Sequence, residues 1–253
     1  MPLILGTNSI KDTGYDVANS LRFDDGSSDN LSRTSWGTAT SDKKFTISVW
    51  VKRCTNGATQ QIVNSYDGST GNDNQLKFKN TDAIELTVST GTEYFLKTNR
   101  LFRDVSAWYH IVFAFDSTQG TNSNRYKLYV NGTQETSFSS VSYPPQNTTY
   151  QFFNNSNANR IGIAHGGSNE PFDGYMAEFC FIDGTALDQT SFGEFDEDSP
   201  TIWKPKDVSG LTFGTNGFYL DFENSSSLGA DVSGNSKNFT VNNLTSIDQS
   251  TDT

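Results

Sequence analysis

Hydrophobic and polar residues alternate with a period of two along much of the chain. In residues 45–52 the odd positions are Phe, Ile, Val and Val, and the even positions are Thr, Ser, Trp and Lys. Successive side chains of a strand point to opposite faces, so this pattern predicts a half-buried strand with Trp50 on its polar face. Residues 108–115 are apolar at almost every position. That run predicts a central strand covered on both faces.

The next alternating segment ends in a turn signal. Residues 125–130 alternate and are followed by Asn131-Gly132, a dipeptide typical of tight hairpins, with a return strand expected at 133–138. One helical turn is expected at 187–192, with Asp188 as its cap. Further strands are predicted at 21–24, 60–65, 75–79, 83–89, 93–97, 159–164 and 175–182. Many short strands between Gly-, Asp- and Ser-rich turns predict an all-β sandwich of two antiparallel sheets.

The composition changes near residue 193. Residues 194–200 read Glu-Phe-Asp-Glu-Asp-Ser-Pro and indicate a linker or an exposed loop, while strand candidates follow at 217–222 and 238–241. This last part is too short to bury a core of its own. We therefore expect an N-terminal arm over 1–19, a sandwich over 20–193, and an acidic linker with a β extension over 194–253. The extension would pack on the sandwich or on a partner.

Charge and hydropathy exclude several classes of function. The 253 residues include 18 Lys and Arg against 29 Asp and Glu, a net charge of −11. A polyanion would be repelled, so neither nucleic-acid binding nor binding to anionic membranes is expected. Apolar runs such as 111–115 are too short for membrane insertion. The first residues, Met-Pro-Leu-Ile-Leu-Gly, contain neither a basic leader nor a long apolar core, so no signal peptide is expected.

The two cysteines are too few for a disulfide scaffold or a cysteine-based zinc site. Cys180 lies in an apolar strand and is expected to be a small buried hydrophobe. A bond between Cys54 and Cys180 remains an alternative, disfavoured because nothing indicates secretion.

Four segments in order resemble a known family. They are FTISVWVK at 45–52, WYHIV at 108–112, YKLYVNG at 126–132 and FDGYMAEFCFIDGTAL at 172–187. Together they are similar to concanavalin A-like jelly rolls of the laminin-G type, over roughly residues 20–193. The resemblance implies a jelly-roll sandwich, a fold that hosts lectins, hydrolases and adhesion modules. The flanking residues resemble those around such domains in tail-fibre and virion proteins of marine bacteriophages. That likeness implies a virion-surface protein made in the cytoplasm of a bacterial host.

The evidence for an enzyme is weak. Hydrolases of this superfamily carry E-x-D-x-E or E-x-D-x-x-E on a strand, because their chemistry needs two carboxylates flanking the sugar bond. The nearest match is Glu194-Phe195-Asp196-Glu197-Asp198, which ends in Asp within an acidic stretch and is better explained as a solvated linker. The only histidines are His110, expected in a buried strand, and His165, so no nucleophilic triad is indicated. We expect a non-enzymatic protein.

The resemblance also implies a possible calcium ion on the rim of the sandwich. The matching loops are 65–74 and 165–173, and the candidate ligands are Asp67, Asp73, Asn169 and Asp173. Calcium prefers several oxygen ligands from loops. Loops rich in Asp and Asn often form turns without any metal, so both interpretations stay open.

Five residues are candidates for contact with a carbohydrate. Trp50 and Tyr129 lie on the polar faces of their strands, and His165, Asn169 and Phe172 belong to the rim loop. Sugars stack on aromatic rings and bond to amides and carboxylates. For Trp50 and Tyr129, buried packing is favoured over ligand stacking. Trp36 is expected to be either an exposed anchor or a plug at a strand end.

Three functions remain. The first is a phage virion module, such as a tail fibre, that binds host cell-surface polysaccharide. The second is a capsid-decoration or fibre-assembly protein that contacts other virion proteins and binds no glycan. The third, a polysaccharide hydrolase, ranks well below them. By resemblance we expect a homo-oligomer, with a trimer as the working guess.

Overall fold

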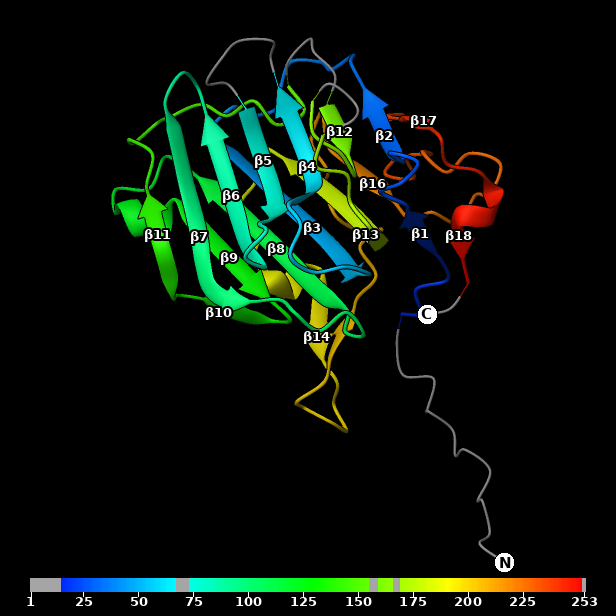
Figure 1. The fold of residues 1–253 in the computed structure, drawn as a ribbon. Helices are drawn as coiled ribbons and strands as arrows, with labels where there is room; N and C mark the ends of the chain where they lie inside the picture. The colour runs from blue at the N-terminus through cyan, green and yellow to red at the C-terminus, as the bar shows by residue number, and fades with distance from the viewer. Residues whose placement is uncertain (1–14, 67–72, 155–158, 166–168, 252–253) are drawn as a thin grey trace, which may run out of the picture.

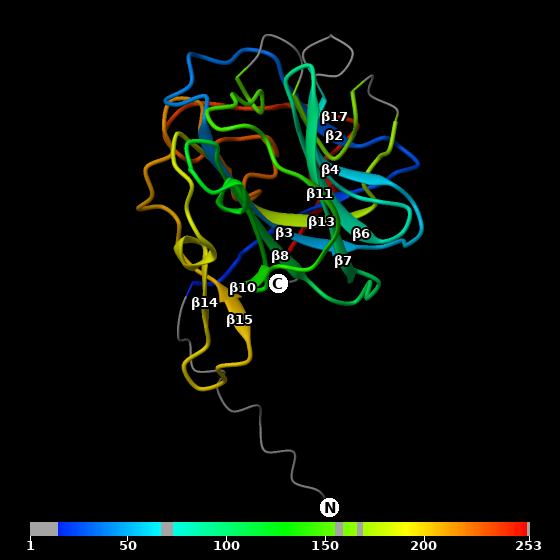
Figure 2. The same cartoon turned by 90° about the vertical axis from the view of Figure 1, so that its left-hand side faces the viewer.

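The computed structural model describes residues 15–66, 73–154, 159–165 and 169–251. In these residues two eight-stranded antiparallel sheets pack face to face (Figures 1 and 2). The predicted all-β sandwich of two antiparallel sheets is confirmed.

Sheet A contains the strand predicted to be central. In spatial order it consists of β10 (Thr133–Glu135), β9 (Tyr126–Val130), β8 (Tyr109–Asp116), β3 (Lys44–Arg53), β13 (Gly174–Asp183), β1 (Ser20–Phe23) and β18 (Gln249–Ser250). A further strand, β16 (Phe218–Leu220), pairs with β13 beside β1. Every residue of β8 is buried, which confirms that this strand is covered on both faces.

Sheet B faces the viewer in Figure 1. In spatial order it consists of β11 (Phe138–Ser142), β7 (Glu93–Leu101), β6 (Ala83–Ser89), β5 (Asp73–Phe78), β4 (Gln60–Tyr66), β12 (Asn159–Ile161), β2 (Asn30–Arg33) and β17 (Thr240–Asn242). The predicted return strand at 133–138 is divided between the sheets. Its first residues form β10 in sheet A, and the chain then crosses to begin β11 in sheet B.

The main core lies between the sheets and is rich in phenylalanine. Phe45 of β3 contacts the rings of Phe113, Phe115 and Phe181, with centroids 5.1–5.8 Å apart. Phe45, Ile47, Val49 and Val51 are all fully buried in this core. The period-two pattern therefore places the side chains as predicted.

The segment 194–200, predicted to be a linker or an exposed loop, forms the end of one strand and the largely exposed turn of a hairpin. Strand β14 (Gly193–Phe195) pairs with β15 (Trp203–Pro205), and the hairpin projects below the sheets in Figures 1 and 2. Asp196 closes the turn by accepting hydrogen bonds from the backbone of Asp198 and Ser199. The amine of Lys204 lies 3.3 Å from the Asp196 carboxylate. Local charge pairing and turn bonds stabilise this acidic stretch, and composition alone does not show them.

The chain after the hairpin completes both sheets. Strand β16 pairs with β13, β17 with β2, and β18 with β1. Residues 185–217 cover the outer face of sheet A and form a third layer in Figure 2 (yellow to orange). A second apolar cluster fills the space beneath that layer: Val112, Tyr129, Cys180, Ile182, Phe192, Val208, Phe213 and Tyr219. Of the two alternatives for the C-terminal extension, the described residues show packing on the sandwich.

The described residues also contain three short 3₁₀ helices. A short 3₁₀ helix, η2 (Gln189–Ser191), follows Asp188, whose carboxylate accepts a hydrogen bond from Thr190 N. The predicted helical turn and its cap are thus confirmed. Two further short 3₁₀ helices are η1 (Asn122–Asn124) and η3 (Ser246–Asp248).

Cys54 is exposed, Cys180 is buried, and both are free thiols. Among the described residues, no helix is long and apolar enough to cross a membrane.

Trp203 fastens the hairpin to sheet A. Its ring lies against Gly132 and Gly193, where a Cβ atom would come within 2.2 Å and 2.6 Å of the ring respectively. Gly132 also has a φ of +77°, so the Asn131-Gly132 turn requires glycine for two reasons. The Trp203 indole donates a hydrogen bond of 2.8 Å to His110 Nδ1.

Replacing Trp203 tests this attachment. Trp203→Ala should lower the free energy of unfolding by about 2–4 kcal/mol, because it removes a large ring and leaves His110 Nδ1 without its donor. Urea denaturation followed by circular dichroism measures the change. The control is Ile202→Ala next to it, whose side chain is 56 % exposed. That variant should stay within about 0.5 kcal/mol of the parent. Equal effects from the two variants would contradict the assigned role.

Candidate functional site

Trp50 lies on the outer face of sheet A in a stack of three rings. The Trp50 and His110 centroids are 4.7 Å apart with planes 16° from parallel, and Trp203 lies beyond His110 at 6.0 Å. The middle ring, His110, is almost fully buried. This arrangement favours packing over ligand stacking for Trp50.

His110 is neutral and has one defined tautomer. Trp203 can only donate, so His110 Nδ1 must accept. Nε2 therefore carries the proton and donates to Ser48 Oγ at 2.9 Å. Burial lowers the pKa of His110 to about 3. Both nitrogens are occupied by structural partners, which is the geometry of a core histidine.

Tyr129 and Phe172 are also packed within the protein. Tyr129 belongs to the apolar cluster on the outer face of sheet A, and burial raises its pKa. It borders a small cavity of about 280 Å³ that Asp116, Lys127 and Asp188 also line. Phe172 is fully buried and contacts Phe23 edge to face. Phe172 therefore cannot reach a ligand in this structure.

His165 and Asp73 come together, as expected for rim residues, at one end of sheet B. His165 Nδ1 lies 3.5 Å from Asp73 Oδ2, and its ring stacks on Tyr66 at 4.3 Å. The Asp73 carboxylate also accepts hydrogen bonds from the amides of Asn64 and Gln75. We call these five residues the Asp73 cluster. Asn169, predicted as a candidate for both sugar and calcium, accepts a hydrogen bond from Ala164 N through its backbone carbonyl.

The four predicted calcium ligands are not assembled in the described residues. Asp67 lies outside them, and Asp73 is engaged as above. The backbone carbonyl of Asp173 binds Cys54 N at 2.9 Å, and its carboxyl pKa is raised by burial and by Asp25 and Asp24. Over residues 15–66, 73–154, 159–165 and 169–251 no group of three or more His, Cys, Asp or Glu side chains is placed to hold a metal. Calcium binding stays a prediction.

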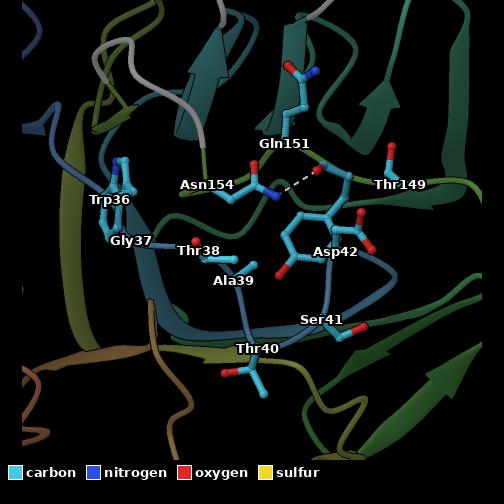
Figure 3. Close-up of a pocket in the computed structure, with 11 residues that line it drawn as sticks. Trp36, Gly37, Thr38, Ala39, Thr40, Ser41, Asp42, Thr149, Gln151 and Asn154 are labelled. Atoms are coloured by element: carbon cyan, nitrogen blue, oxygen red, sulfur yellow. Dashed lines mark hydrogen bonds between the residues drawn. The ribbon is translucent and has the colours of Figure 1, made fainter.

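A larger cavity opens at the rim of the sandwich, at a place that the sequence prediction missed. This rim pocket has a volume of about 670 Å³ and is shown in Figure 3. Two segments form its walls: residues 36–42 between β2 and β3, and residues 149–151 with Asn154 between β11 and β12. Within the first segment, the sequence predicts a role for Trp36 alone, as an exposed anchor or a plug at a strand end.

A buried carboxylate holds the two walls in place. Asp183, at the end of β13, accepts hydrogen bonds from the Tyr150 hydroxyl at 3.0 Å and from Thr40 N at 2.7 Å. Asn216 N donates to the same carboxylate at 3.0 Å. The walls also contact each other, since Tyr150 N donates to the carbonyl of Asp42. Burial and the adjacent Asp183 raise the pKa of Tyr150, which keeps its hydroxyl protonated as a donor. The pocket is therefore largely preformed.

The lining is rich in hydroxyl and amide groups. It presents Thr38, Thr40, Ser41, Thr149, Gln151 and Asn154, with Asp42 as its one charged residue among those described. Trp36 stands at one end in Figure 3. Its ring packs on Phe153, Phe218 and Phe239, which makes it mainly a plug at a strand end. Side chains of this kind can donate and accept hydrogen bonds with a neutral, polyhydroxylated ligand.

The candidate hydrolase motif lies elsewhere. Glu194 and Asp196 are on the β14–β15 hairpin, where both approach Lys204, at 3.8 Å and 3.3 Å. Neither residue lines the rim pocket. The motif is therefore a charge-paired hairpin, and it offers no pair of carboxylates across a cavity.

Residues 25–190 match the family described as the concanavalin A-like lectin/glucanases superfamily. The chain belongs to this superfamily. This confirms the resemblance drawn from the four sequence segments. No curated protein matches the chain.

Several solved structures are similar to this chain at low identity. A heptameric SAP-like pentraxin from Limulus polyphemus is 15% identical with a TM-score of 0.48, over 69% of this chain and 80% of that one. Domains LG4-5 of the mouse laminin α1 chain are 12% identical with a TM-score of 0.49, over 84% and 50%. The CBM40 of a Ruminococcus gnavus IT-sialidase, bound to α2,3-sialyllactose, is 18% identical with a TM-score of 0.39, over 53% and 74%. Such distant likeness does not indicate what this chain binds.

Replacing Asp183 tests how the pocket is held. Asp183→Asn should cost about 2–4 kcal/mol of unfolding free energy, because at least one of the three donors then loses a charged acceptor in a buried site. Urea denaturation measures the loss. Asp25→Asn, at an exposed position, is the matched control and should change stability by less than about 0.5 kcal/mol. An Asp183 variant as stable as the control would show that the carboxylate does not hold the walls.

Proposed function

We propose that this protein is a non-catalytic glycan-binding module whose rim pocket binds neutral, hydroxyl-rich sugars. The observation that carries the proposal is the pocket itself, a preformed cavity of about 670 Å³ lined by hydroxyls, amides and one carboxylate. Its volume lies within the range of roughly 300–1,000 Å³ typical of small-molecule sites.

The lining supports sugar over other ligands. A sugar hydroxyl donates one hydrogen bond and accepts others, and the Thr and Ser hydroxyls and Asn and Gln amides of the pocket can do both. Large apolar ligands are disfavoured because Trp36 is the one large aromatic side chain at the open end, and much of its ring is packed. Tyr150 contributes mainly from below, since it is almost fully buried.

Charge supports neutral sugars over acidic ones. The chain has a net charge of −11, Asp42 is exposed in the pocket, and none of the described lining residues is basic. Sialic and uronic acids would meet a like charge without a compensating cation. We therefore expect neutral or amino sugars to bind more tightly than acidic ones.

A hydrolase is the less supported alternative. Glycoside hydrolysis generally needs two carboxylates flanking the scissile bond. Asp42 is the one acid among the described residues that line the pocket. On this proposal a bound polysaccharide keeps its length.

We further propose a setting on a bacteriophage virion, as a tail-fibre or similar component that binds host surface polysaccharide and contacts other virion proteins. The support is the resemblance of the flanking residues, and the same resemblance suggests a trimer. A purely structural role in fibre assembly or capsid decoration would be favoured if the C-terminal extension needed a partner to order it. Instead, strands β16, β17 and β18 pair within their own sandwich.

Binding measurements on the purified chain test the proposal. Calorimetry against neutral and acidic host polysaccharides, in calcium and in EDTA, should show binding to a neutral glycan. Asp42→Ala should weaken it about 10- to 100-fold, since a hydrogen bond to a charged group contributes roughly 1.5–3 kcal/mol. Asp25→Ala is the exposed control and should bind as the parent does. The polymer should keep its length after incubation.

Other results would redirect or overturn the proposal. If His165→Ala weakens binding while Asp42→Ala does not, the site is the Asp73 cluster on sheet B. If binding disappears in EDTA alone, a calcium site mediates it. If the chain binds no host glycan, the glycan-binding function is wrong and the assembly role takes its place.

A further inference from the structure

A β-bulge interrupts β13, which pairs with β3, β1 and β16 in sheet A. Ala177 is paired with Trp50 and Cys180 with Ser48, so β13 holds one more residue than β3 between these pairs. The extra residue falls at Glu178, whose backbone is left-handed with a φ of +52°. On the other edge, β1 pairs before the bulge and β16 pairs after it. Bulges of this kind re-aim a side chain.

The bulge presents the Glu178 carboxyl to two tyrosine hydroxyls. Glu178 Oε2 lies 2.9 Å from the Tyr15 hydroxyl and 2.6 Å from the Tyr219 hydroxyl. The two hydroxyls are 2.7 Å apart. The three oxygens thus form a closed triangle of hydrogen-bond distances, which we call the Glu178 triangle. Glu178 and Tyr219 are each only 6% exposed.

Counting protons decides the charge state of this triangle. Three hydrogen bonds need three protons, and two tyrosine hydroxyls supply two. If the carboxylate were ionised, only two protons would be available, and one of the three contacts of 2.6–2.9 Å would have no proton between its oxygens. A protonated Glu178 supplies the third proton, and each oxygen then donates once and accepts once.

We propose that the Glu178 triangle is a proton-operated latch that holds residues 15–18 against sheet A. With Glu178 protonated, the ring of hydrogen bonds is complete and Tyr15 is docked. When Glu178 ionises, one of the three contacts has no proton and becomes repulsive, and Tyr15 leaves. The segment stays attached beyond this point, because Asn19 donates to the carbonyl of Ser250 and β1 begins at Ser20.

The surroundings agree with the proton count. Burial raises the pKa of Glu178 to about 7; the hydrogen bonds from Tyr219 and Tyr15 lower it, and Asp221 and Glu223 after β16 raise it. The other titratable groups facing the triangle are also acidic. Cys180 on the same strand raises the pKa of both tyrosines. Asp231 accepts a hydrogen bond from Tyr219 N and raises the pKa of Cys180.

The direction of the pH dependence follows. The triangle has a proton for each of its three contacts only when Glu178 is protonated, so docking takes up a proton. Burial raises the pKa of Glu178 in the folded protein to about 7. Docking is therefore fully favoured at low pH. It weakens by up to about tenfold per pH unit as the pH approaches the Glu178 pKa of about 7 and is lost as the pH rises through that value.

Chymotrypsin cleavage after Tyr15 in the full chain measures docking directly. The rate is divided by that for a free peptide of residues 10–20, which removes the pH dependence of the protease. This relative rate should be low at pH 6 and rise by up to about tenfold by pH 8.5, the limit for the loss of one proton from a group with a pKa of about 7. A rate ratio that does not change with pH would overturn the latch.

Two variants and a control separate the latch from a structural effect. Glu178→Gln cannot ionise, so its relative rate should not change with pH. Tyr15→Phe keeps the cleavage site but loses the hydrogen bonds of the Tyr15 hydroxyl, so it should be cut quickly at every pH. Because this change lies outside the sandwich, the variant still tests the latch if Glu178→Gln does not fold. Glu223→Gln removes a nearby exposed carboxylate and should keep the rise. A rise that persists in Tyr15→Phe, or in a folded Glu178→Gln, would also overturn the proposal.

Discussion

The structure depends on the burial of both faces of β13. Its inner face contributes Met176, Phe179 and Phe181 to the core between the sheets, and its outer face contributes Cys180 and Ile182 to the second cluster. Burying this outer face requires a covering layer, which the segment 185–217 supplies. Part of the chain after residue 193 therefore helps to bury this face, with Val208, Phe213 and Tyr219 in the second cluster, and β16 pairs directly with β13.

Strand β13 carries both of the carboxyl groups on which the two proposals rest. At one end Asp183 leaves the sheet as a buried carboxylate, and its three donors set the walls of the rim pocket. In mid-strand the bulge turns Glu178 toward two hydroxyls. Both features follow from the cost of burying a carboxyl group, which must be met by hydrogen bonds, by protonation, or by both. The same physical requirement fixes a pocket in one place and creates a pH-sensitive contact in the other.

The aromatic residues on the outer face of sheet A pack within the protein, which is the interpretation that the sequence favoured for Trp50 and Tyr129. In a sugar-binding protein an aromatic ring on the polar face of a strand suggests a stacking platform. Here Trp50 stacks on His110, and Tyr129 lies beneath the covering layer. The pocket depends on small polar side chains instead. Specificity would then come from hydrogen bonds and charge more than from ring stacking.

The sequence alone determined the sandwich, because period-two alternation and the Asn131-Gly132 turn are local properties of the chain. It also determined the family, through four ordered segments. Only the tertiary structure decided the rim pocket, since its two walls are more than 100 residues apart and meet through Asp183. The Glu178 triangle likewise joins Tyr15 to Tyr219, 204 positions away. Such contacts depend on how distant segments pack on the sheets, including which face a third layer covers. The pattern of neighbouring residues does not predict that packing.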